Sequence, residues 1–191
     1  MERGSGILLH ITSLPNKFGL GCLSKEAYEF IDFLSEAKCK YWQTLPVNPV
    51  YYGDCPYSCY SSFSINTALI DLSEYLTEDE LRKIGFSEKT KNKYDELQNK
   101  YDVALKLIYK KFKDITDISE FVNNNTWVYE HALYTAIKKK YNNTWFFDFP
   151  KGLKERNPKA IEEFKKNNTN DINTQIFAQY IIFPFLSCFV L

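Results

Sequence analysis

Residues 41–63, YWQTLPVNPVYYGDCPYSCYSSF, decide how the rest of the chain is interpreted. The apolar residues 41–45 predict a strand, which must stop at Pro46 and Pro49 because proline cannot donate a hydrogen bond to a β-ladder. A loop rich in tyrosine and hydroxyl groups follows the strand, where α/β folds usually bind ligands. This loop favours a sugar, because tyrosine rings pack on the C–H faces of a pyranose while hydroxyls and a carboxylate bond to its polar groups. The alternative is that the tyrosines pack on the protein's own core.

The segment before this stretch predicts a strand and a helix. Residues 6–11 form a short continuous apolar run, typical of a strand buried on both faces. His10 within it is expected to be a core histidine with satisfied hydrogen bonds rather than a ligand. A helix follows that Ser24 caps and that ends near Lys38 and Lys40. Strand, helix and strand form a βα unit, whose two strands should be parallel neighbours.

The residues after the stretch are predicted to be mainly helical. Residues 68–72 are expected to be a short extended piece, and Thr77 with Glu80 forms a capping box for a helix that ends at Gly85. Four further helices are expected over residues 94–112, 127–138, 157–164 and 172–182. An Asn-Pro pair begins the helix over residues 157–164. We expect residues 165–170 to be a loop and Pro184 to break the last helix.

Composition excludes several classes of protein. The chain has 191 residues, 45% of them hydrophobic, and its 24 basic residues balance its 24 acidic ones, so nucleic acid is not an expected partner. No apolar run reaches the length of a membrane span or a signal peptide, so we expect a cytoplasmic protein without a membrane partner. The odd number of cysteines, five, favours reduced thiols. Cys55 and Cys59 share a loop, but no further ligands lie near them in sequence, so no metal site is expected.

The order of motifs carries a resemblance to a known family. SGILLHITSLP, GLGCLSKEAYEFIDFL, KYWQTLPVNP, YGDCPYS and LIDL resemble, in order and spacing, the N-terminal third of 4-α-glucanotransferases (amylomaltases, or disproportionating enzymes) of glycoside hydrolase family 77. Two later segments, WVYEHALYTAIKKKY and QYIIF, extend the resemblance to about residues 3–183. It implies an α/β fold, the N-terminal part of a (β/α)8 TIM barrel with a mainly helical inserted subdomain. Residues 1–72 would then hold the first two β/α units and the sugar-binding loop, 73–170 the insert, and 171–191 a truncated helix returning to the barrel with an aberrant apolar tail.

The resemblance also implies an activity. The family transfers a segment of an α-1,4-glucan to another glucan or to glucose, in the carbohydrate metabolism of the cell interior, with neither metal nor organic cofactor. The expected partners are therefore α-1,4-glucans and maltooligosaccharides. Tyr57 matches the tyrosine that stacks on the sugar at the cleavage point, Asp54 and Cys55 match its loop neighbours, and Tyr52 matches a tyrosine of an outer glucan-binding site. Cys55 stands where the family usually has serine.

The catalytic residues of the family have no counterpart in this sequence. Its three carboxylates lie in the part of the family that follows the matched region, and the nucleophile belongs to an Arg-x-Asp motif. None of Arg3, Arg82 and Arg156 is followed two residues later by aspartate. Because the chemistry needs two carboxyl groups about 5 Å apart, we assign no catalytic residue and expect this chain alone to be inactive.

Three readings follow for the chain as a whole. The first is a fragment of a 4-α-glucanotransferase, the second a non-catalytic α-glucan-binding protein derived from that family, and the third a helical structural protein whose motifs are fortuitous. The uncharged end PFLSCFVL is expected to result from out-of-frame translation or a premature end. Strands without neighbours on both sides are expected to limit solubility.

Overall fold

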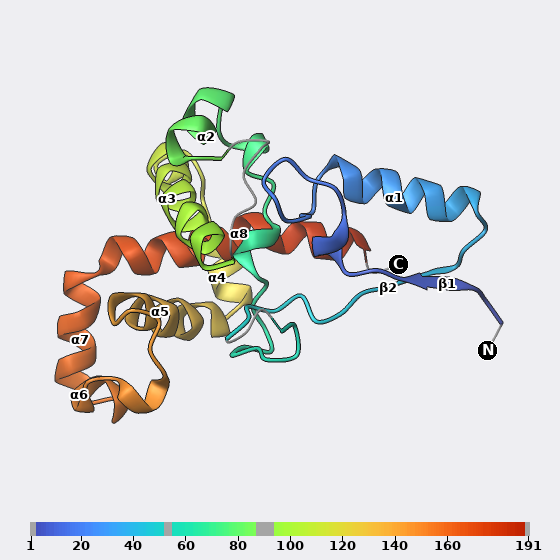
Figure 1. Cartoon of the computed structure of the whole chain (residues 1–191). Coiled ribbons are helices and arrows are strands. Elements are labelled where there is room, and N and C mark those ends of the chain that lie inside the picture. The colour runs from blue at the N-terminus through green and yellow to red at the C-terminus, as the bar shows by residue number, and fades with distance from the viewer. Residues whose placement is uncertain (1–2, 52–54, 87–93, 190–191) are drawn as a thin grey trace. The chain divides into compact units, whose positions relative to one another are not determined.

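The computed structural model describes residues 3–51, 55–86 and 94–189 (Figure 1). The chain divides into two compact units, one made of Met1–Ile108 with Ile182–Leu191 and the other of Tyr109–Ile181. We call them unit 1 and unit 2 and describe each by itself. The division into barrel units (1–72), insert (73–170) and returning helix (171–191) remains a prediction.

The βα unit expected at the start of unit 1 is present. Strands β1 (Gly6–Leu8) and β2 (Tyr41–Gln43) pair in parallel, with Ile7 opposite Trp42. Helix α1 (Lys25–Glu36) connects them and runs beside the sheet (Figure 1). It contacts β2 through Phe30, whose ring meets that of Trp42 edge-on at 4.9 Å between centroids. The prediction of two parallel neighbouring strands is therefore confirmed.

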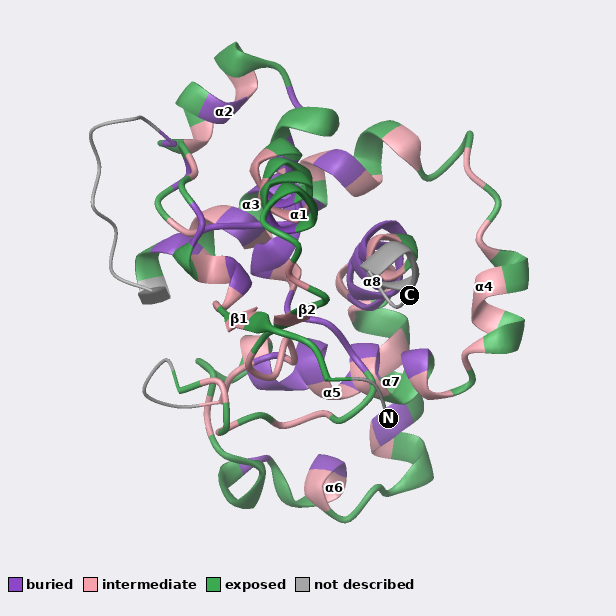
Figure 2. Ribbon diagram, turned by 90° about the vertical axis from the view of Figure 1, so that its right-hand side faces the viewer, coloured by how far each residue is buried: buried purple, intermediate pink, exposed green. Residues whose placement is uncertain are grey.

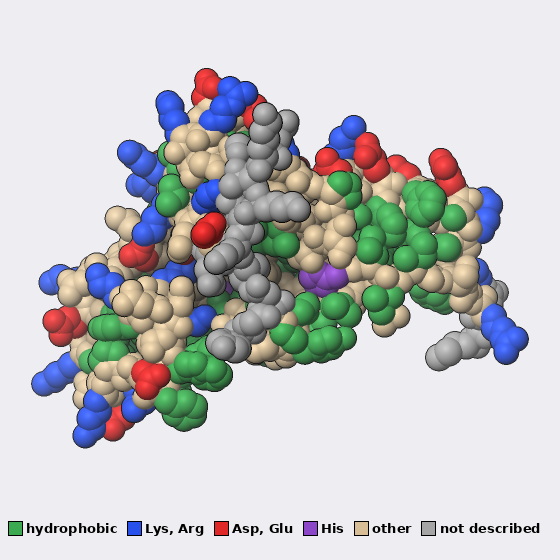
Figure 3. Space-filling view, viewed as in Figure 1, with side chains coloured by type: hydrophobic (Ala, Val, Ile, Leu, Met, Phe, Trp, Pro, Cys, Tyr) green, Lys and Arg blue, Asp and Glu red, His purple; other side chains and the backbone are tan. Residues whose placement is uncertain are grey.

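The extent and burial of these strands differ from the expectation. Both are shorter than predicted, and residues 11–13 form a 3₁₀ turn, η1 (Ile11–Ser13), because the His10 side chain accepts a hydrogen bond from the Thr12 N–H. The prediction that the first strand is buried on both faces is wrong, since Leu8 is 56% exposed. Among the described residues the sheet has two strands, and in each of them the first and last residues are exposed. A group of hydrophobic side chains is also exposed on the surface over α1 (Figure 3), and Phe33 of this helix is exposed.

Residues 68–72 do not form the extended piece that was expected. Ala68 and Leu69 belong to a 3₁₀ turn, η2 (Thr67–Leu69), and Leu72 begins a second one, η3 (Leu72–Glu74), with the extended residues Ile70 and Asp71 between them. Each turn begins after a residue whose side chain accepts a backbone N–H, Asn66 from Ala68 and Asp71 from Ser73. Local side-chain bonds of this kind compete with strand pairing. The buried Leu69 and Leu72 therefore enter the core from turns.

The capping box predicted for the next helix, α2 (Glu78–Ile84), is confirmed. The Glu80 N–H donates to the Thr77 hydroxyl at 3.3 Å, and the Thr77 N–H donates to the Glu80 carboxylate at 2.9 Å. Gly85 ends the helix in the left-handed region, with φ of 97°. Two local signals thus set both ends of this helix.

Removing the Thr77 hydroxyl tests the capping box. We expect Thr77→Ala to lower the free energy of unfolding by about 1 kcal/mol, because an N–H at the start of α2 loses its partner. Thr77→Ser keeps the hydroxyl and should lose much less. Urea denaturation followed by circular dichroism measures both. Equal stabilities of the alanine and serine variants would contradict the role of the hydroxyl.

Helix α3 (Tyr94–Phe112) supplies unit 1 with a buried aromatic residue. Tyr101 is fully buried, and its hydroxyl donates to the Ile70 carbonyl at 3.3 Å. Its ring meets that of Phe86 at 5.7 Å, and Phe86 in turn meets Phe18 at 5.4 Å. Burial raises the pKa of Tyr101 well above its ordinary value, so the residue is a neutral hydrogen-bond donor in the core.

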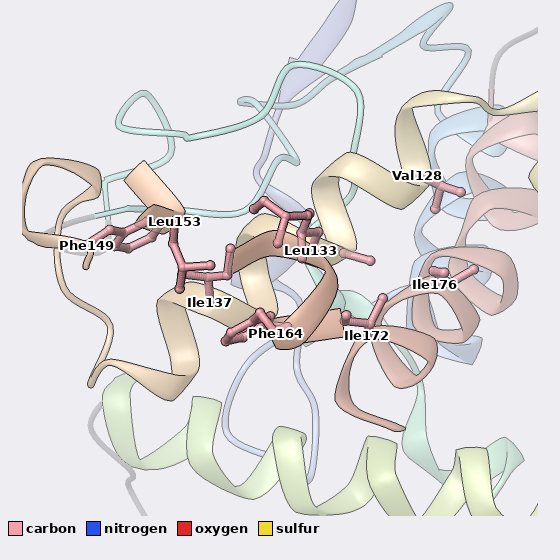
Figure 4. Packing of buried hydrophobic residues seen from close by; sticks show 11 residues of the cluster. Val128, Leu133, Ile137, Phe149, Leu153, Phe164, Ile172 and Ile176 are labelled. Atoms are coloured by element: carbon pink, nitrogen blue, oxygen red, sulfur yellow. The ribbon is translucent and has the colours of Figure 1, made fainter. Parts of the chain in front are cut away.

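Unit 2 is helical in the described structure. Its elements are α4 (Ser119–Asn124), α5 (Trp127–Lys140), η4 (Phe146–Asp148), α6 (Lys151–Lys154), α7 (Pro158–Asn167) and most of α8 (Thr169–Phe189). Its core brings Leu133 and Ile137 of α5 together with Phe164 and Ile172 (Figure 4). Helix α4 has no buried residue and is green and pink throughout in Figure 2, which explains why its sequence gave no periodic signal.

Helices α7 and α8 correct two predictions. Asn157 caps α7 with Pro158 at its first turn, as expected, but residues 165–170 are not a loop. Only Asn168 separates the two helices, because its side chain donates to the Phe164 carbonyl at 2.8 Å and closes the end of α7. Pro184 does not break α8, which continues to Phe189. A proline removes one backbone hydrogen bond, and the turns on either side can outweigh that loss.

Candidate functional site

A cavity of about 280 Å³ lies in unit 1, at the carboxyl ends of the two parallel strands. His10 and Thr12 follow β1, and Pro46 and Asn48 follow β2. Residues after strands of parallel sheets meet at one edge, where such folds bind ligands. The full lining is His10, Thr12, Gly19, Leu20, Pro46, Val47, Asn48, Val50, Pro56, Asn66, Leu69 and Leu97.

His10 links the two strand ends. Its Nδ1 lies 2.6 Å from the Thr12 hydroxyl, and its Nε2 lies 3.3 Å from the Pro46 carbonyl oxygen. Because Nδ1 also accepts the Thr12 N–H, the proton resides on Nε2, which donates to Pro46. Both ring nitrogens are satisfied as expected, but the ring is half-buried and lines the cavity instead of lying in the core.

Two asparagines hold the opposite wall. The Asn48 amide donates to the Ser64 carbonyl at 2.9 Å, and the Asn66 N–H donates to the Val47 carbonyl at 2.8 Å. These bonds tie the segment after β2 to the segment that enters η2. Asn66 also uses its side-chain oxygen to start η2, so one residue sets both the wall and the turn behind it.

The tyrosine-rich loop folds back on itself beside the cavity. Val50 and Cys59 form an antiparallel bridge, and the Tyr51 N–H donates to the Ser58 carbonyl at 2.6 Å. A turn closes at the tip, where the Ser58 N–H donates to the Cys55 carbonyl at 2.9 Å. The Tyr60 ring meets the Tyr51 ring edge-on at 6.0 Å, so Tyr60 packs within the loop.

The predicted sugar-binding residues fall into two groups. Tyr57 lies in the turn and is 71% exposed, and Cys55 is exposed at the start of the same turn. Pro56, between them, lines the cavity. Tyr52 and Asp54 lie outside the described residues. The described part of the loop therefore presents the Tyr57 ring to solvent next to a cavity of mixed polar and apolar lining.

The cavity offers polar groups to a ligand, but its described lining contains no pair of carboxyl groups for glycosidic cleavage. None of the described lining residues is acidic. Within residues 3–51, 55–86 and 94–189, no group of three or more His, Cys, Asp or Glu side chains could hold a metal ion. The polar groups that face the cavity are an imidazole, a hydroxyl and two amides, which suit the hydroxyl groups of a sugar.

Two buried groups outside the cavity lining have clearly shifted pKa values. Burial raises the pKa of the Cys22 thiol to about 12. The second histidine, His131 in unit 2, packs against Trp127 at 6.1 Å, and burial lowers its pKa to about 4. It is therefore neutral at physiological pH. In the part of the chain that the structure describes, no helix is long and apolar enough to cross a membrane.

The family model described as 4-alpha-glucanotransferase matches residues 9–188. The chain belongs to the 4-alpha-glucanotransferase family. It is 34% identical to the enzyme of Clostridium butyricum over 184 residues, which are 92% of this chain and 38% of the relative. It is also 34% identical to the enzyme of Aquifex aeolicus, over 95% of this chain and 38% of the relative. The chain thus spans about 38% of the length of these curated relatives.

A solved structure of a family member has the same arrangement. An amylomaltase from Streptococcus agalactiae in complex with acarbose matches with a TM-score of 0.88 and 30% identity, over 96% of this chain and 39% of that chain. The resemblance inferred from the motifs is confirmed by both comparisons. The fold of the described part is that of the matched part of an amylomaltase.

Sequence reasoning missed three cavity residues of this 4-alpha-glucanotransferase family chain. Asn48 and Asn66 were not singled out as binding residues, and His10 was assigned to the core. A signal was available, because His10 and Asn48 come a few residues after the two predicted strands. Asn66 offered no such signal, since its position depends on a contact with Val47, 19 residues earlier.

Proposed function

We propose that this chain provides a glucan-binding part of a 4-α-glucanotransferase, which transfers a segment of an α-1,4-glucan to another glucan or to glucose. The observation that carries the proposal is the exposed Tyr57 ring next to Pro56, which lines the cavity at the carboxyl ends of two parallel strands. Family membership supports the reaction class. The acarbose bound to the Streptococcus agalactiae amylomaltase supports an oligosaccharide ligand.

The residues of this chain bind and orient the glucan in this proposal. The Tyr57 ring stacks on a pyranose face, and its neighbours Asp54 and Cys55 contact the same sugar. Tyr52 contributes to an outer part of the glucan site. His10, Asn48 and Asn66 fix the strand ends and the wall from which the loop projects. Proton transfer and the covalent step require two carboxyl groups about 5 Å apart, which the rest of a complete enzyme supplies.

We further propose that β1, α1 and β2 are the first units of a (β/α)8 barrel and that residues 73–170 form a helical insert. The parallel pairing with a connecting helix is the repeat from which such barrels are built. The likeness to an amylomaltase over 39% of that chain supports this arrangement.

A second candidate function is a non-catalytic α-glucan-binding module. The observation that favours it is the lack of an acidic side chain among the described residues of the cavity lining. This candidate shares the sugar site and differs in having no reaction. Binding without turnover, even after the missing part of a relative is supplied, would favour it.

The sugar role of Tyr57 is tested by Tyr57→Ala. We expect the variant to bind maltoheptaose about 1–3 kcal/mol more weakly than the unmodified chain, because the sugar loses an apolar surface to stack on. Isothermal titration calorimetry or affinity electrophoresis in amylose-containing gels measures the difference. Equal affinity of the two proteins would refute the assignment.

Two matched variants separate binding from folding. Tyr57→Phe keeps the ring and should retain most of the affinity. Tyr60→Ala removes a ring that packs against Tyr51, so it should lower the melting temperature more than Tyr57→Ala does. If Tyr57→Ala instead destabilises the chain as much as Tyr60→Ala does, Tyr57 is a packing residue.

A further inference from the structure

Two free thiols flank Tyr57. Cys55 and Cys59 are both exposed, whereas Cys22 is buried and Cys39 half-buried. Because thiol reagents must reach the sulfur, we expect Cys55 and Cys59 to react faster than the buried Cys22. The proposed sugar site gives a role to Cys55, but it does not explain a second exposed thiol at Cys59.

A single tight turn separates the two cysteines in the chain. The hydrogen bond from the Ser58 N–H to the Cys55 carbonyl closes a four-residue turn, in which the first and last Cα atoms lie within about 7 Å. Cys59 follows Ser58 directly, and its bridge to Val50 holds it at the base of the turn. A disulfide needs Cα atoms about 4.4–6.8 Å apart. The turn reverses the chain between the two cysteines, so a bond between their sulfur atoms requires a local adjustment of the backbone at residues 58–59.

We propose that Cys55 and Cys59 form a redox modification site, which a small-molecule disulfide such as glutathione disulfide converts into an intramolecular disulfide that encloses Tyr57. One thiolate attacks the oxidant and releases the first glutathione thiol, giving a mixed disulfide on the protein. The second thiolate then attacks that mixed disulfide and releases the second glutathione thiol. The protein loses its two thiol protons and two electrons, and the oxidant is reduced to two molecules of glutathione.

The new bond changes the surroundings of Tyr57. It joins the residues on either side of the segment 56–58, so the turn loses much of its freedom and the position from which the Tyr57 ring projects is restrained. The consequence for sugar binding rests on the proposed function of Tyr57. We expect the affinity for maltoheptaose to differ at least threefold between the oxidised and reduced chains, because a stacked ring must match the plane of the sugar.

The test is oxidation of the chain by glutathione disulfide without denaturant, followed by proteolysis and mass spectrometry. We expect the peptides that contain Cys55 and Cys59 to be joined, with the intact protein losing two thiol hydrogens and gaining no glutathione. Dithiothreitol should reverse the change. Cys55→Ser should accumulate a stable glutathione adduct on Cys59, and Cys59→Ser should accumulate one on Cys55. Cys39→Ser should behave like the unmodified chain.

Several results would overturn the proposal. They are two glutathione adducts on one chain without a link, a dimer as the main product, or modification of the buried Cys22 as fast as that of the exposed pair. A link that forms without any change in maltoheptaose affinity supports the modification site and counts against the sugar role of Tyr57. Failure of the proposed function is thereby distinguished from failure of the thiol pair.

Discussion

The purified 191-residue chain is expected to release no glucose from maltotriose above the rate in buffer. Retaining transfer between glucans needs a nucleophile and an acid, and enzymes of this kind accelerate their reactions by about 10⁶-fold or more. The chain spans about 38% of its relatives and has no Arg-x-Asp motif. Sugar binding alone leaves the barrier to glycosidic cleavage in place. The measurement is chromatography of glucose and longer oligomers after prolonged incubation.

A complementation experiment tests whether the missing part of the enzyme accounts for the expected inactivity. The remaining part of the Clostridium butyricum enzyme, co-expressed with this chain, should restore some production of glucose and longer oligomers, because the exposed faces of β1 and β2 then have partners. The same pairing with Tyr57→Ala should give less. Turnover that copurifies with the chain alone and falls in Tyr57→Ala would contradict the prediction of inactivity.

The second large effect is expected for Gly21→Ala. An added Cβ would collide with the carbonyl oxygen of Ile11 and lie 2.7 Å from that of Leu14. Both neighbours are backbone atoms of the turn after β1, and Gly21 itself donates to the Thr12 carbonyl at 3.1 Å. The backbone must move to make room, so we expect the free energy of unfolding to fall by about 3–5 kcal/mol. Chemical denaturation of the two proteins measures the loss.

Gly85→Ala is the matched control. Gly85 has φ of 97°, but its nearest neighbours are side-chain atoms of Lys100, at 3.5 Å or more from an added Cβ. The expected loss is about 1 kcal/mol, the strain of a left-handed residue with a side chain. If Gly21→Ala is no more destabilising than Gly85→Ala, the turn after β1 adapts, and the close backbone contact is unimportant.

Several elements could be predicted because their signals are local. The capping box of Thr77 and Glu80 and the start of α7 at Asn157 are made by hydrogen bonds within three residues. The βα unit follows from an apolar run, a capped amphipathic helix and a second apolar run. The motif order also identified the family, which the comparisons confirm. In each case the evidence lies within one stretch of sequence.

Other features were predicted wrongly from the sequence because they depend on contacts with other parts of the structure. The burial of a strand depends on what covers it. The prediction of a strand within residues 6–11 is therefore correct, whereas the predicted burial of Leu8 is wrong. Residues 68–72 have the composition of a strand, but Asn66 and Asp71 turn their backbone into 3₁₀ turns. Pro184 is a helix breaker by local rules, but α8 continues through it.

The sequence by itself determined the family, the parallel βα unit and most helix starts, and it predicted a sugar site in the loop around Tyr57. Only the tertiary structure decided the cavity, because its walls join residues far apart in the chain. His10 reaches the Pro46 carbonyl 36 residues later, and Asn48 reaches Ser64 16 residues later. A periodic pattern shows which face of an element is apolar, but it does not show which polar groups a chain brings together after it folds. That depends on packing between segments, and here it brings an imidazole and two amides into the lining of one cavity.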